Sequence, residues 1–174
     1  MPQKPTHSKL VILDRDGVIN HDSDHYIKSP DEWHPIPGSL EAIAKLNQAG
    51  CHIVVATNQS GIGRGLYDMD ALNAIHMKFH RLLAKVGGHV DAIFFCPHTD
   101  ADNCLCRKPL PGMIEQISQR YSVPIKGVPI VGDSIRDLVA GVSVGAEPHL
   151  VLTGNGEKAR ASGGLPPYTA IHQD

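Results

Sequence analysis

The sequence has no apolar stretch long enough to cross a membrane, and it has little net charge. Spanning a bilayer takes ~20 consecutive apolar residues, whereas the apolar run that leads into Asp14 covers only Leu10–Leu13. Such a run is also too short for the apolar region of a signal peptide. A net charge of −2 gives no general attraction to nucleic acid or to an anionic membrane. We therefore expect a cytoplasmic protein with no nucleic-acid or membrane partner.

Cysteines are also few, and their distribution is uneven. The chain has 4 cysteines in 174 residues, and three of them lie in one short segment, Cys96–Cys106. Two disulfides would be possible in a secreted protein, but in a reducing cytosol clustered cysteines are better explained as metal ligands. The hydrophobic content of 41% is ordinary for a globular protein. We expect a single domain over residues 1–174.

Short apolar segments alternate with helical patterns along the chain. Near-continuous apolar runs of strand length are typical of strands that are buried on both faces of a parallel sheet. The predicted strands are Leu10–Asp14, His52–Asn58, Asp91–Cys96, Val128–Asp133 and His149–Gly154. After Gly154 the sequence GNGEKARASGGLPP indicates a loose excursion before a last short strand near Thr169–Ile171.

The segments between these strands have the apolar spacing of helices. In Asp68–Val86 the apolar residues recur mainly at intervals of three and four, which places them on one helix face. Other helices are predicted from Ser39 as the N-cap to Gly50 as the C-cap, from Pro111 to Tyr121, and over Ile135–Ser143. This alternation predicts an α/β protein, with a Rossmann-like open parallel sheet and helices on both faces.

Polar residues follow the predicted strands, at the edge of the sheet where ligands bind in open α/β proteins. Asp14 and Asp16 follow the first strand, Thr57 ends the second, Asp133 ends the fourth, and Lys108 precedes the third helix. A single Asp after a strand is usually a turn or helix-cap residue. Together, however, Asp14 and Asp133 can converge on Mg²⁺, which prefers carboxylate ligands. With the Thr57 hydroxyl and the Lys108 cation they describe a phosphoryl-transfer site.

The segment 96–108 has the spacing of a zinc-binding loop. The pattern C-x-H-x5-C-x-C offers a complete tetrahedral ligand set for structural Zn²⁺, made of Cys96, His98, Cys104 and Cys106. Bound zinc would fix the loop and place Arg107 and Lys108. A disulfide plus a free thiol is the alternative, although a Cys-x-Cys pair closes poorly. A zinc ribbon for nucleic acid would need a second ligand pair and a basic face, and neither is evident.

The ordered set of motifs resembles haloacid-dehalogenase (HAD) superfamily phosphatases over about residues 9–153. The set consists of DxDGx(I/V)N after the first strand, Thr-Asn after the second, a Lys before a proline-initiated helix, and GDSxxD after the fourth strand. The fuller strings DRDGVIN, TNQSGIGRG and CxH…CxCRKP are similar to one branch of this family, which acts on a heptose bisphosphate or on histidinol phosphate.

The resemblance implies a role for each matched residue. Asp14 would be the nucleophile that forms an aspartyl-phosphate, and Asp16 the general acid and base. Mg²⁺ would be bound by Asp14, by the carbonyl of Asp16 and by Asp133. Thr57 and Lys108 would bind the phosphoryl oxygens. Asp137 would contact and orient the residues that bind the substrate or metal, or would be an ordinary solvated or N-terminal helix charge.

The spaces between the motifs are too short for the cap domain that many HAD relatives insert. We therefore expect a HAD fold without a cap, an open site, and selectivity that comes from short loops. The candidate substrate-binding residues are Asp22, Ser23, Asp24, His25, Asn58, Gln59, Ser60, Arg107 and Ser134. The loop His21–Trp33 is equally compatible with an ordinary polar excursion.

The resemblance implies a Mg²⁺-dependent phosphatase that removes the C7 phosphate of D-glycero-D-manno-heptose 1,7-bisphosphate. Such a reaction belongs to the synthesis of ADP-heptose and of lipopolysaccharide or surface-glycan precursors. Histidinol phosphate is the alternative substrate. A non-catalytic phosphate- or zinc-binding module is the alternative from another class, and the presence of both Asp14 and Asp16 argues against it. We expect a monomer whose partner is a small sugar phosphate.

Overall fold

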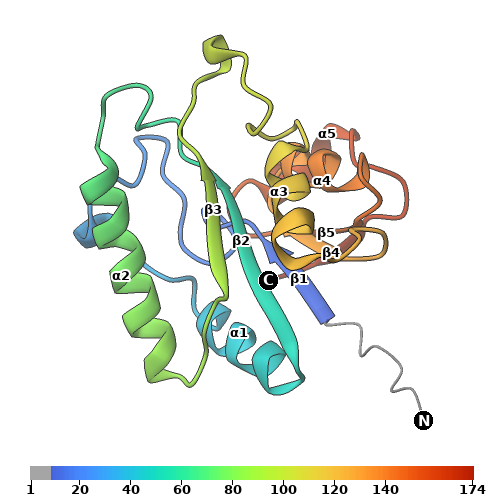
Figure 1. Ribbon diagram of the computed structural model, residues 1–174, viewed down its shortest axis with the longest axis horizontal. Coiled ribbons are helices and arrows are strands. Elements are labelled where there is room, and N and C mark those ends of the chain that lie inside the picture. Colours follow the sequence, from blue (N-terminus) through green and yellow to red (C-terminus); the bar gives the residue numbers. More distant parts are fainter. Residues whose placement is uncertain (1–8) are drawn as a thin grey trace.

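The structure, a computed structural model that describes residues 9–174, is built on a six-stranded parallel sheet (Figure 1). The strand order is β3-β2-β1-β4-β5-β6. The strands are β1 (Lys9–Leu13), β2 (Cys51–Asn58), β3 (Ala92–Cys96), β4 (Pro129–Gly132), β5 (Glu147–Val151) and β6 (Ala170–His172). The order reverses at β1, so the chain crosses to the other side of β1 between β3 and β4. In open α/β sheets this switch point opens a crevice at the carboxyl ends of the strands.

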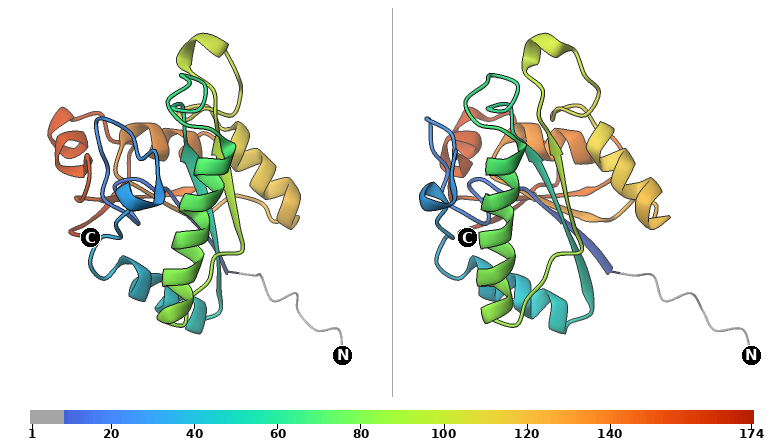
Figure 2. Two further views of the ribbon diagram at one scale, coloured as in Figure 1. Left: turned by 90° about the vertical axis from the view of Figure 1, so that its left-hand side faces the viewer. Right: turned by 60° about the vertical axis from the view of Figure 1, so that its left-hand side comes forward.

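Helices cover both faces of the sheet, which confirms the predicted fold class (Figure 2). The helices α1 (Ser39–Gln48) and α2 (Met69–Lys85) pack on one face. The other face carries α3 (Gly112–Tyr121), α4 (Ile135–Val142) and α5 (Gly156–Ser162). Alternate residues of a strand point to opposite faces. Thus Leu10 and Ile12 of β1 pack in the core with α3, whereas Val11 and Leu13 pack in the core with α1 and α2.

Two local predictions were wrong. The segment after Gly154 was expected to be loose, but it forms α5, whose buried Ala159 packs with Leu138 and Leu150. This short helix has little apolar periodicity of its own and is stabilised by tertiary packing. Ser39 was expected to cap α1, but Gly38 is the N-cap, and the Ser39 hydroxyl donates to the Ile19 carbonyl at 2.6 Å.

The strands also differ in detail from the prediction. β3 was expected to be buried on both faces, but four of its five residues are only partly buried because it lies at the edge of the sheet. β5 begins at Glu147 and ends at Val151, earlier than predicted. The last short strand, β6, lies within one residue of the predicted position.

Two loops rise together above the carboxyl edge of the sheet (Figure 2). One is residues 59–68 after β2, and the other is residues 97–110 after β3, which contains the 3₁₀ turn η2 (Asp100–Asp102). They are joined by Gly63 N–H, which donates to the Pro97 carbonyl at 2.9 Å. A second 3₁₀ turn, η1 (Pro30–Glu32), lies between β1 and α1. None of the helices within residues 9–174 has the length and apolar character needed to span a membrane.

Candidate functional site

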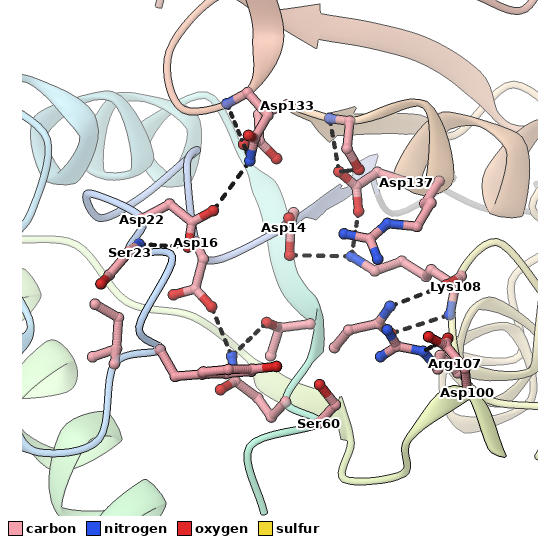
Figure 3. A pocket seen from close by; sticks show the side chains of 18 of the residues that line it. Asp14, Asp16, Asp22, Ser23, Ser60, Asp100, Arg107, Lys108, Asp133 and Asp137 are labelled. Atoms are coloured by element: carbon pink, nitrogen blue, oxygen red, sulfur yellow. Dashed lines mark hydrogen bonds and ion pairs between the residues drawn. The ribbon is translucent and has the colours of Figure 1, made fainter. Parts of the chain in front are cut away.

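Lys108 and two carboxylates meet at the carboxyl ends of β1 and β4 (Figure 3). The Lys108 Nζ lies 3.1 Å from Asp14 Oδ1 and 2.6 Å from Asp137 Oδ1, and it donates to the Ala56 carbonyl at 2.7 Å. Burial opposes the charge on this lysine, which is 2% exposed, but Asp137 and then Asp14 outweigh it and raise the pKa of Lys108. Lys108 is therefore a fixed cation that points directly at Asp14.

Three carboxylates form a group at this point. Asp14, Asp133 and Asp137 each bring one oxygen within 4.8 Å of the others. Burial, followed by the charge of Asp137, raises the pKa of Asp14 well above 3.8 and that of Asp133 to about 7. Within residues 9–174 their ion pairs come from Lys108 alone. A buried oxygen donor set with an excess of negative charge fits a hard divalent cation such as Mg²⁺.

Glycines allow these carboxylates to come together. Gly17 has a φ of +83°, and a side chain there would collide with the carboxylate of Asp133. A side chain at Gly132 would collide with Asp137. Gly17 therefore leaves space for Asp133 beside the end of β1, and Gly132 leaves space for Asp137 of α4.

Asp16 lies apart from the acidic group, on the other side of Asp14 from Lys108 (Figure 3). Its Oδ1 accepts from Arg15 at 2.8 and 3.0 Å and from Asn20 at 2.9 Å, and its Oδ2 accepts from Gln59 at 2.9 Å. Burial works to raise the pKa of Asp16, but the charge of Arg15 and these hydrogen bonds outweigh burial and lower it. The structure thus holds Asp16 as an oriented carboxylate outside the acidic group.

Asn58 fixes the backbone of Lys108. Its Nδ2 donates to the Lys108 carbonyl at 3.0 Å, and its Oδ1 accepts from Lys108 N–H at 3.1 Å. Asn58 was predicted to bind substrate; it lines the cavity, but its amide is occupied by this contact. The loop residue Lys108 is thereby attached to the end of β2.

Asp137 fulfils both roles that the sequence left open. Its Oδ2 accepts from the backbone N–H and the hydroxyl of Ser134 and so caps α4. Its other oxygen forms the ion pair with Lys108. Ser134, a predicted substrate ligand, lines the cavity but donates its hydroxyl to this cap.

The acidic group forms the floor of a cavity of about 380 Å³. Arg64, Arg107 and Arg136 also line the cavity. The hydrogen bond and charge of Arg107, and then the charges of Arg136 and Arg64, lower the pKa of Asp100, so the three arginines share one part of the wall. Most predicted substrate-binding residues line the cavity, namely Asp22, Ser23, Asn58, Gln59, Ser60, Arg107 and Ser134. Asp24 instead lines a neighbouring cavity of about 360 Å³, and the exposed His25 lines neither.

Several residues at the site were not singled out from the sequence, among them Arg15, Tyr26, Asp100, Arg136 and Asn155. Arg15 is completely buried, and its Nη1 lies 3.1 Å from Nε2 of the buried His76. Tyr26 has a φ of +66°, an uncommon conformation for a non-glycine residue that often occurs at functional sites. The backbone N–H of Asn155 donates to Asp133 Oδ2. Asn155 directly precedes α5, the helix that the sequence did not predict.

Arg107 approaches the cavity from the loop after β3. Its Nε donates to Asp100 Oδ1 at 2.6 Å, and its side chain is 12% exposed. Its Nη1 is buried without a hydrogen-bond partner among the described residues. This Nη1 is a donor without a partner on a side chain that lines the cavity, and an anion reaches it only if the guanidinium turns toward the cavity.

The predicted zinc ligands converge on one point. All four cysteines are free, and the Sγ atom of Cys96 lies 3.6 Å from Cys104 Sγ and 3.1 Å from Cys106 Sγ. The His98 Nδ1 lies 3.6 Å from Cys96 Sγ and 3.4 Å from Cys106 Sγ. These separations are too long for a disulfide of ~2.05 Å. They are near those of sulfur and nitrogen ligands around one tetrahedral Zn²⁺.

Comparisons with known proteins agree with this geometry. The HAD-hydrolase-like family model matches residues 105–173, and the polynucleotide kinase 3 phosphatase model matches residues 9–137. The chain is 61% identical over 166 residues to a D-glycero-beta-D-manno-heptose-1,7-bisphosphate 7-phosphatase of Bordetella bronchiseptica, covering 95% of this chain and 93% of the relative. The proteins of the same name from Neisseria meningitidis are 54% identical, with 94% and 88% covered.

Solved structures show the same similarity. The D,D-heptose 1,7-bisphosphate phosphatase of B. bronchiseptica, complexed with magnesium and phosphate, superposes with a TM-score of 0.94 at 61% identity, covering 95% of this chain and 93% of that one. The phosphatase of that name from Burkholderia thailandensis gives a TM-score of 0.77 at 54% identity, with 95% and 92% covered.

Proposed function

We propose that this chain, which belongs to the HAD phosphatases in the family of the D-glycero-beta-D-manno-heptose-1,7-bisphosphate 7-phosphatases, removes the C7 phosphate of that sugar bisphosphate. The observation that carries the proposal is that a single cavity holds Asp14 beside Lys108 on its floor and Arg107 in its wall. The floor, with Asp14 and Lys108, suits the phosphoryl group under attack, and the wall, with Arg107, suits a second phosphate. The product would enter the synthesis of ADP-heptose and lipopolysaccharide precursors.

Asp14 is proposed to be the nucleophile. Its carboxylate attacks phosphorus, the bond to the sugar oxygen breaks, and an aspartyl-phosphate forms. Asp16, on the other side of Asp14, is proposed as the general acid and base. Its lowered pKa leaves it ionised at rest, so it first has to take up a proton, which it gives to the departing oxygen. It then takes a proton from the water that hydrolyses the aspartyl-phosphate. Thr57 and Lys108 bind the phosphoryl oxygens, over which negative charge is spread in the transition state.

Mg²⁺ is proposed as the cofactor, held by Asp14, Asp133 and the backbone of Asp16, with Asp137 as a neighbour. The fit rests on the excess negative charge of the acidic group. Burial, followed by the charge of Asp137, raises the pKa values of Asp14 and Asp133. The ion supplies positive charge that lets an anionic nucleophile and an anionic substrate approach each other.

Structural Zn²⁺ is proposed for the cluster of Cys96, His98, Cys104 and Cys106. The last ligand is adjacent to Arg107, so the metal would hold the residues that line the arginine side of the cavity. With four protein ligands no coordination position stays open for chemistry.

We predict one Zn²⁺ per chain, and its loss in the double variant Cys104→Ser, Cys106→Ser. Elemental analysis of freshly purified, reduced protein measures the metal, and limited proteolysis measures the order of residues 97–110. Loss of zinc should expose this loop to cleavage while Mg²⁺ still binds, because the proposed Mg²⁺ ligands follow β1 and β4 and lie outside the loop. The control Cys51→Ser, outside the cluster, should keep its zinc. A zinc-free wild type would refute the assignment.

We predict that Arg107→Ala lowers kcat/KM by ~10- to 150-fold for the heptose 1,7-bisphosphate, the usual effect of one charge-assisted contact. Hydrolysis of a simple monophosphate ester should change little. Arg suits the second phosphate because its planar fork donates to two oxygens at once. Specificity constants for the bisphosphate, a monoester and histidinol phosphate, measured in the wild type and the variant, test the proposal.

Histidinol phosphate is the rival substrate, and the arginine wall argues against it because this molecule carries an amine in place of a second phosphate. If wild type prefers histidinol phosphate, the proposed substrate is wrong. Equal losses on all three substrates would show that Arg107 acts on the loop and not on the second phosphate. Arg120→Ala, an exposed arginine on α3, is the matched control for the loss of one charge.

A further inference from the structure

A hydrogen-bonded pair, Gln59 and Tyr67, lies behind two of the proposed reacting groups. The Gln59 side chain donates from Nε2 to Asp16 Oδ2 and to Thr57 Oγ1, both at 2.9 Å. The Tyr67 hydroxyl donates to Gln59 Oε1. Gln59 is 3% exposed, and both ends of its amide are thus used within the protein. It was predicted to bind substrate; it lines the cavity, but its amide is occupied by these contacts.

The orientation of the Gln59 amide is set from both ends. An ionised Asp16 carboxylate only accepts hydrogen bonds, so the NH₂ end of the amide has to face it. The carbonyl end then faces Tyr67, whose hydroxyl is its one hydrogen-bond donor in the described part of the chain. Burial, the largest influence, raises the pKa of Tyr67 to about 12, so the hydroxyl keeps its proton at neutral pH.

Local sequence allows Tyr67 to reach Gln59. The loop folds back after β2, with Leu66 N–H donating to the Gly61 carbonyl at 2.9 Å. Gly61 is buried, and a side chain there would collide with the ring of Tyr67. The glycine of TNQSG therefore makes the space that the ring occupies. Replacing Tyr67 by Phe would keep this packing and remove only the hydroxyl.

We propose that Tyr67 acts through Gln59 as a positioning residue, which orients both Asp16 and Thr57 for phosphoryl transfer. The donation from Gln59 fixes Asp16 Oδ2, while Arg15 and Asn20 fix Oδ1. The same NH₂ group occupies a lone pair of Thr57 Oγ1, which leaves the Thr57 proton free for a phosphoryl oxygen. This inference rests on the proposed roles of Asp16 and Thr57.

The test compares Tyr67→Phe, Gln59→Met, and the double variant, with Tyr168→Phe as the control because Tyr168 is 98% exposed. Tyr67→Phe should lower kcat by about 5- to 50-fold, less than the ~10²–10⁴-fold for loss of a general acid–base, with KM unchanged. The melting temperature should fall slightly, because the buried Gln59 Oε1 loses its donor. Gln59→Met should have a larger effect. The double variant should be no slower than Gln59→Met, because the Tyr67 hydroxyl is connected to Asp16 and Thr57 only through the Gln59 amide.

Single-turnover formation of the phosphoenzyme separates positioning from a merely structural role. An ester with a poor alkyl leaving group needs the proton from Asp16, whereas p-nitrophenyl phosphate does not. Tyr67→Phe should therefore slow the alkyl ester more than the nitrophenyl ester. An equal effect on both esters would show that Tyr67 does not act on Asp16. Strictly additive effects of Tyr67→Phe and Gln59→Met on kcat would show that Tyr67 does not act through Gln59.

The outcomes also distinguish this inference from the proposed function. A kcat in Tyr67→Phe equal to that of Tyr168→Phe overturns the inference, whichever phosphate ester the wild type prefers. A wild type that hydrolyses monoesters but not the heptose bisphosphate overturns the proposed substrate and leaves the predicted effect of Tyr67 to be measured on the monoester. A wild type inactive toward every phosphate ester overturns both.

Discussion

Asp14→Asn is expected to reduce kcat on the order of 10⁴–10⁶-fold, as removal of a covalent nucleophile does. An amide cannot form the acyl-phosphate, although Lys108 and the cavity remain in place to bind the substrate. Steady-state hydrolysis measures the loss. Acid quenching of the wild type during turnover, followed by peptide mass spectrometry, should find phosphate on Asp14. Phosphate trapped on another residue would contradict the assignment.

The same substitution should stabilise the protein when Mg²⁺ is absent. Burial and neighbouring carboxylates raise the folded-state pKa of Asp14 above its ordinary value of 3.8. A carboxyl group with a raised pKa costs stability above its unfolded pKa, and this cost disappears as the pH falls below that value. In Mg²⁺-free, zinc-loaded protein, Asp14→Asn should therefore melt above the wild type at pH 7.

The pH dependence of this difference is the check. The gap in melting temperature should close as the pH approaches 3.8. Asp70→Asn, an exposed aspartate on α2, is the matched control. A variant that is less stable than the wild type at pH 7 would show that Asp14 makes a net stabilising ion pair with Lys108. A variant that is inactive but more stable than the wild type, as expected here, is a common result at functional sites.

The strand ends were predictable from sequence because parallel strands finish at one edge of the sheet. Asp14 and Asp133 end or follow strands with clear apolar runs, and the structure brings their carboxylates within 4.8 Å. Their closeness also depends on β1 lying beside β4 in the sheet. This pairing cannot be predicted from the order of the strands along the chain. Gly17 then removes the atoms that would keep the two strand ends apart, and Gly132 makes room for Asp137 of α4.

Side-chain contacts between distant segments were not predictable in the same way. Asn58 and Lys108 are 50 residues apart, and nothing in either segment shows that an amide would hold a lysine backbone. Arg15 resembles a variable position between two aspartates, yet it is completely buried against His76. The helix α5 was missed for a related reason, since it depends on packing against Leu138 and Leu150 more than on its own sequence.

Lys108→Met is expected to reduce both activity and stability. Loss of one donor at the phosphoryl oxygens typically lowers kcat by ~10²–10³-fold. Removing one partner of a buried ion pair typically costs ~3–5 kcal/mol of unfolding free energy. Both apply here because Lys108 is 2% exposed and contacts Asp14 and Asp137. Urea denaturation and steady-state kinetics measure the two effects, and Lys126→Met, an exposed lysine, is the control.

The loss of stability should depend on pH in a defined direction. Without Lys108, Asp14 loses its cation but keeps Asp137 as a negative neighbour, so the folded-state pKa of Asp14 should rise further. The cost is then present above the unfolded carboxyl pKa of about 3.8 and is relieved as the pH falls through this region, because Asp14 takes up a proton. The stabilities of wild type and Lys108→Met should therefore converge in acid.

A second variant separates the two roles of Lys108. In the double variant Lys108→Met, Asp137→Asn, the uncompensated charge of Asp137 is gone, while its cap on Ser134 can still be made by an amide oxygen. Stability should recover relative to Lys108→Met, whereas kcat should not, because the cation at the phosphoryl group is still missing. If the double variant stays as unstable as Lys108→Met, the cost comes from lost packing and not from unpaired charge. If Lys108→Met turns over at nearly the wild-type rate, Lys108 organises the carboxylates without contributing to phosphoryl transfer.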